Sequence, residues 1–106
     1  MIRDDELYDL VTEGRSALAA PTFEKVSATL DVFPRMLDAL DRLSRHTEAL
    51  RAVRTDLTIA VHQFREEVWN VQKAHPEVTY RAAHIHASTR HISAIIDRLE
   101  AIINEE

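Results

Sequence analysis

The stretch that decides the fold runs from residue 34 to residue 74 and reads PRMLDALDRLSRHTEALRAVRTDLTIAVHQFREEVWNVQKA. It contains no glycine, and no proline after its first residue, so one helix of roughly 60 Å is possible. A heptad frame fits the stretch, with apolar residues at nine of its eleven core positions. The two exceptions are Thr47 and Arg54, and the polar run 44–47 is where the helix breaks if it is not continuous.

The segment 77–105 repeats the same pattern after His75-Pro76, which ends the long helix. Its apolar residues are spaced at seven, and folding the chain back at the proline pairs them with the long helix. The resulting layers are Val71 with Val78, Phe64 with Ile85, Leu57 with Ile92 and Leu50 with Leu99. The two segments are therefore predicted to form an antiparallel hairpin.

The first arm, residues 2–33, is predicted to be helical and bent. Its apolar residues recur at spacings of three and four, Pro21 ends the first helix, and Asp31 and Pro34 interrupt or kink the second. Three arms of comparable length (2–33, 34–74 and 77–105) pack most simply with the first covering the hairpin. We therefore expect an all-α, up-down-up bundle with a bent first arm and a long central helix, forming a single domain over residues 1–106.

Composition limits the function classes. One glycine and three prolines among 106 residues leave too few turn residues for barrels or phosphate-binding loops. The net charge of −5 disfavours nucleic acid and anionic membranes as partners. The absence of cysteine fits a reducing compartment, and neither a secretory leader nor a run of about 18 apolar residues is present. We expect a cytoplasmic protein without a membrane anchor.

Six histidines raise the question of a metal site, but no His-x-x-x-His spacing, which would place two neighbouring imidazoles on one helical face, occurs among them. His62 and Glu66 are expected to form a surface pair, and His84 is expected to hydrogen-bond Glu67 across the hairpin. No metal and no cofactor are predicted. The alternative is a metal- or pH-responsive bundle that uses five side chains, namely His62, Glu66, Glu67, His84 and His91.

The last segment carries a basic stripe, because no acidic residue occurs from Val78 to Ile96. The stripe consists of Arg81, His84, His86, Arg90 and His91. One interpretation is that it neutralises the first 32 residues, which hold seven acidic and three basic residues. The other is that it binds an acidic partner or, weakly, nucleic acid, although only Tyr80 is available there for base stacking.

Trp69 occupies an outer position of the heptad and points away from the hairpin seam, on the same side as Ile59 and His62. Either these residues form a contact patch or the first arm covers them. No arrangement typical of catalysis can be assembled, so we expect no enzyme activity. The prediction is a protein-binding module, whose binding residues are Ile59, His62, Trp69, Arg81 and Arg90.

The mode of action expected for such a module is regulation or inhibition by covering a partner surface, with a homodimer as a further possibility. Compact, acidic, cysteine-free helical chains include inhibitors carried by phages and mobile elements, such as anti-CRISPR proteins. The comparison rests only on size, composition and expected helical fold.

Overall fold

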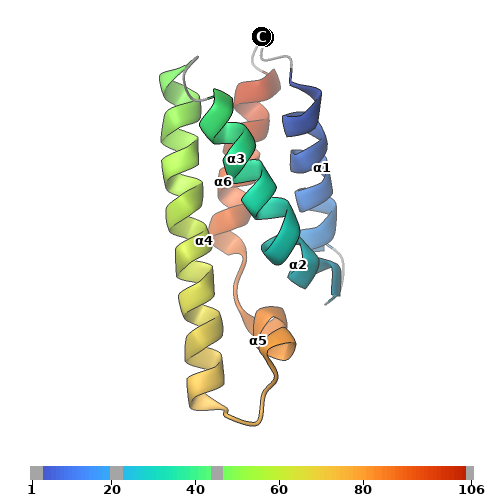
Figure 1. Cartoon of the computed structure of the whole chain (residues 1–106), viewed down its shortest axis with the longest axis vertical. Coiled ribbons are helices and arrows are strands. Elements are labelled where there is room, and N and C mark those ends of the chain that lie inside the picture. Colours follow the sequence, from blue (N-terminus) through green and yellow to red (C-terminus); the bar gives the residue numbers. More distant parts are fainter. Residues whose placement is uncertain (1–3, 20–22, 44–46, 105–106) are drawn as a thin grey trace.

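The computed structural model describes residues 4–19, 23–43 and 47–104, and the regular elements in these ranges are all helical (Figure 1). In chain order they are α1 (Asp5–Ala19), α2 (Phe23–Ser27), the π-helical turn η1 (Ala28–Val32), α3 (Phe33–Leu43), α4 (Glu48–Ala74), α5 (Tyr80–His86) and α6 (Arg90–Asn104). The all-α bundle predicted from the hydrophobic periodicity is confirmed.

The arms are divided differently from the prediction. The chain runs along the bundle in α1, returns through α2, η1 and α3, runs back in α4 and returns again in α5 and α6 (Figure 1). Segment 2–33 is therefore not one bent arm, and segment 34–74 is not one helix. Helix α3 packs between α1 and α4, while α6 contacts both α1 and α4, so the bundle closes on itself.

The boundary between α3 and α4 falls at the polar run where the sequence placed a possible break. Helix α3 ends at Leu43, residues 44–46 lie outside the described residues, and α4 begins at Glu48. The hydroxyl of Thr47 caps α4 by accepting a hydrogen bond from the Leu50 amide at 3.1 Å. Arg54 forms an ion pair with Asp41 of α3 at 3.0 Å. Both polar exceptions in the heptad thus belong to the junction between these two antiparallel helices.

Pro34 does not end a helix, because α2, η1 and α3 follow one another without interruption from residue 23 to residue 43. A proline inside an α-helix clashes with the carbonyl of the fourth preceding residue, which here is Leu30. The π-helical turn immediately before it, in which the Phe33 amide bonds the Ala28 carbonyl, widens the backbone at this point. The predicted interruption is therefore accommodated as one wide turn.

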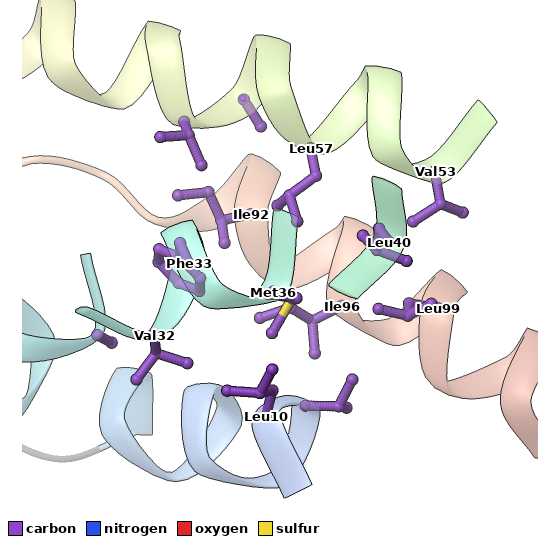
Figure 2. Close-up of a cluster of buried hydrophobic side chains, with 14 of the residues drawn as sticks. Leu10, Val32, Phe33, Met36, Leu40, Val53, Leu57, Ile92, Ile96 and Leu99 are labelled. Carbon is purple, nitrogen blue, oxygen red and sulfur yellow. The ribbon is translucent and has the colours of Figure 1, made fainter. Parts of the chain in front are cut away.

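The core is shared by α1, α3, α4 and α6, whose side chains meet along the axis of the bundle (Figure 2). Leu57 of α4 and Ile92 of α6 are both buried there, as the hairpin register predicts. Helix α3, which packs against both α1 and α4, contributes fully buried Phe33, Met36 and Leu40. The outer face of α4, on the side away from α3 and α6, has no described helix packed against it.

Gly14 is buried where α1 meets α3, and it offers a test of this packing. A Cβ added there would lie 3.4 Å from Met36 Cε and 3.5 Å from Phe33 Cε1, which is ordinary contact. We therefore expect Gly14→Ala to raise the free energy of unfolding by about 0.5–1 kcal/mol, because alanine loses less backbone entropy in a helix. Urea titration measures the change; Gly14→Val, which adds two further carbons, should lower stability. A destabilised Gly14→Ala variant would contradict the spacing of α1 and α3.

Candidate functional site

The outer face of α4 is the candidate site. It consists of residues at helical spacing on the side opposite the buried stripe, namely Arg51, Thr55, Ile59, His62, Glu66, Trp69 and Lys73, all of them exposed. Trp69 is 66% exposed and Ile59 is 51% exposed. The first arm therefore does not cover Trp69. The interpretation that the first arm covers this ring is therefore wrong.

The middle of this face is polar. His62 Nε2 lies 3.3 Å from Glu66 Oε1, one helical turn along α4, and both side chains are well exposed. This is the surface pair that the sequence predicts. The pair separates Ile59 from Trp69, so the α4 outer face alternates between apolar and polar groups along its length.

A shallow hollow adjoins Ile59 between α4 and α6. It encloses about 260 Å³ and is lined by Asp56, Ile59, Ala60, Gln63, His91, Ile95 and Arg98. An ion pair between Arg98 of α6 and Asp56 of α4 holds the two helices together at this hollow. Ile59 therefore stands at the edge of a depression that a partner's side chain can enter.

Arg81 and Arg90, the other predicted binding residues, are exposed but lie on different elements, α5 and α6. The predicted basic stripe is interrupted between them, because His84 is fully buried. The structure thus places Ile59, His62 and Trp69 on one face of α4. Arg81 and Arg90 do not belong to that face.

The predicted pair between His84 and Glu67 is wrong. His84 Nδ1 lies 2.8 Å from the Tyr80 carbonyl, and its ring packs against the rings of Tyr80 and Phe64 at 4.3 and 5.6 Å. Glu67 instead accepts a hydrogen bond from the Ser88 amide at 2.9 Å. The prediction assumed one continuous last helix, whereas α5 is a separate short helix that turns His84 into the core.

Lys25 of α2 holds the end of α5, a role that the sequence analysis missed. Its ammonium group donates to the carbonyls of Ile85 at 3.0 Å and Ala87 at 2.7 Å. Burial lowers the pKa of Lys25, and the charge of Glu67 opposes this shift. Nothing in the sequence marks this contact, because both acceptors are backbone atoms. Lys25 and Glu67 together anchor the segment between α5 and α6 to the rest of the bundle.

We expect Lys25→Met to lower the free energy of unfolding by about 1–3 kcal/mol, because two part-buried carbonyls lose a charged donor. Lys73→Met is the matched control: Lys73 is exposed at the end of α4, and its loss should change stability by less than about 0.5 kcal/mol. Equal effects of the two variants in urea titrations would contradict the anchoring role.

Urea titrations of the wild type and Lys25→Met at several pH values give a second test. Because burial holds the pKa of Lys25 in the folded state below its ordinary value, the unfolded chain binds this proton more tightly. The stability of the wild type should therefore rise relative to Lys25→Met as the pH increases from the folded-state pKa towards the unfolded-state value.

Charge is divided unequally between the two halves of the described chain. Residues 4–43 hold nine acidic and four basic residues, whereas residues 47–104 hold seven of each. Acidic residues near the start of the chain pair mainly with α3, as in Glu6 with Arg42 and Glu13 with Arg35.

Comparisons with known proteins add no family. The chain matches no protein-family model, no curated protein and no solved structure at a significant level. Among the described residues, no cluster of three or more histidine, aspartate or glutamate side chains could hold a metal ion. No described helix has the length and apolar character needed to cross a membrane.

Proposed function

We propose that this chain is a non-catalytic, cytoplasmic protein-binding module that acts through the α4 outer face, as a regulator or inhibitor covering a surface of its partner. The observation that supports this function is the 66% exposure of Trp69 on the same helix face as half-exposed Ile59. We propose Arg81 and Arg90 as further contacts if the partner is large enough to extend from the α4 outer face onto α5 and α6.

Energetics favour this use of the face. An exposed tryptophan keeps a large apolar surface in water, and binding hot spots are enriched in tryptophan rings that become buried at the interface. Helix α4 has 27 residues, and its opposite side is anchored in the core by seven buried residues. A partner therefore meets side chains that are already held on a rigid element, which reduces the entropy lost on binding.

The experiment begins with a photoreactive benzoylphenylalanine in place of His62, and in a control protein in place of Tyr8. Tyr8 is 53% exposed on α1, away from the α4 outer face. A partner cross-linked from position 62 but not from position 8 is identified, produced in pure form and titrated against the unmodified chain.

Affinity for that purified partner then decides the proposal. We expect Trp69→Ala to weaken binding by about 30-fold or more, which corresponds to about 2 kcal/mol, while Tyr8→Ala leaves the affinity unchanged. Equal affinities for the two variants would remove the α4 outer face from the proposed function.

A further inference from the structure

We propose that the α4 outer face binds the same face of a second copy of this chain, forming a symmetric dimer in which the two α4 helices run antiparallel. The two-fold axis passes α4 at the level of residue 64, so that any two facing residues have numbers summing to 128. This inference rests on the proposed function, because it uses the same face and assigns to it a second copy of this chain in addition to a heterologous partner.

The first argument is that the α4 outer face is self-complementary in this register. Ile59 faces Trp69 of the second copy, and by symmetry Trp69 faces Ile59 of the second copy. Both exposed apolar side chains are therefore covered in each of the two chains. His62 faces Glu66 of the second copy in the same way, and an imidazole N–H can donate to a carboxylate. The two-fold rotation thus places apolar side chains opposite apolar side chains, and the hydrogen-bond donor opposite the acceptor.

The outer part of the face agrees with this arrangement. Thr55 faces Lys73 of the second copy, so the lysine meets a neutral hydroxyl. Arg51 of α4 faces Glu77, which follows the end of the helix and is exposed. In this register no residue of the α4 outer face is placed against a like charge.

Other pairings are less favourable. A parallel dimer in register places Arg51, Glu66 and Lys73 each against its own copy, and like charges at close range repel. An antiparallel shift of one helical turn places Trp69 opposite Gln63 or Thr55. The same shift places Ile59 opposite Lys73 or Arg65. Of these arrangements, the register about residue 64 alone covers both apolar residues without a charge conflict.

Self-association is tested first, by sedimentation equilibrium of the wild type, Trp69→Ala and Tyr8→Ala. For the wild type we expect the average mass to rise with concentration from 12.1 kDa towards twice that value. Trp69→Ala should weaken association at least about tenfold, because each dimer loses two rings. Tyr8→Ala should associate like the wild type, since Tyr8 lies on α1.

The register is tested with spin labels, which the chain accepts at single sites because it contains no cysteine. Labels are attached to Gln63→Cys and to Ala49→Cys, both at exposed positions of α4. In the antiparallel dimer, the labels at position 63 are separated along the helix axis by about 3 Å and those at position 49 by about 45 Å. A parallel dimer gives the same separation at both positions.

Three results would overturn the dimer: a monomer at every concentration up to the solubility limit, equal label separations at the two positions, or association that Trp69→Ala leaves unchanged. None of them decides the proposed function, which depends on the affinities of Trp69→Ala and Tyr8→Ala for the purified heterologous partner. Failure of that titration alone, with the dimer intact, would instead restrict the α4 outer face to self-association.

Discussion

Phe64→Ala is expected to lower the free energy of unfolding by about 3–5 kcal/mol. The Phe64 side chain is 2% exposed, and its ring packs against that of His84, so truncation leaves a cavity between α4 and α5. Trp69→Ala, five residues along the same helix, should change stability by less than about 1 kcal/mol, because its ring is mostly in water. Urea titrations of the two variants measure the contrast.

This contrast separates the two faces of α4. A chain in which Trp69→Ala costs as much as Phe64→Ala has its tryptophan in the core, and the α4 outer face would then lose its role in binding. The slope of the unfolding free energy against urea should be the same in both variants, which shows that the same surface becomes exposed on unfolding.

Phe33→Ala should cost a similar amount, about 3–5 kcal/mol, for a reason that the sequence alone did not supply. Phe33 is fully buried at the junction of η1 and α3, and it lies against α1 at the site of Gly14. Leu30→Ala is the matched control, because Leu30 belongs to η1 but is 46% exposed. Its truncation should cost less than about 1 kcal/mol.

The second contrast tests the return of the chain between α1 and α3. In the three-arm arrangement predicted from sequence, residues 30 and 33 belong to one bent arm that covers the hairpin, and, one helical turn apart, both would face it. Similar costs for both variants in the same urea titration would support that arrangement and contradict the contrast between buried Phe33 and exposed Leu30.

The helices themselves were predictable, since apolar residues recur at helical spacing in each of them. The break near residue 44 was also marked, by a polar run and by Thr47, whose side chain suits an N-cap. Pro34 misled the prediction, because the sequence rule for proline assumes an α-helix and a π-helical turn avoids the clash. The direction in which each helix runs along the bundle depends on packing between distant segments, which the local periodicity of the sequence does not determine.

The candidate site was predicted unevenly for the same reason. Trp69 and Ile59 lie on a long helix with a regular register, so their outward direction followed from the heptad alone. His84 was misplaced because the register was extended across residues 87–89, where α5 ends and α6 begins. Lys25 could not be identified, because its partners are backbone carbonyls about sixty residues away.

The unequal division of charge between residues 4–43 and residues 47–104 has a consequence for the kinetics of binding. The long-range field of the molecule originates mainly from the acidic α1–α3 half, whereas the proposed contact surface belongs to the half with balanced charge. The charges around α4 therefore contribute little attraction of their own, and for a partner without a strong net charge the association rate should change little between low and high ionic strength. Differences in affinity among variants of this surface should therefore lie mainly in the dissociation rate of the complex.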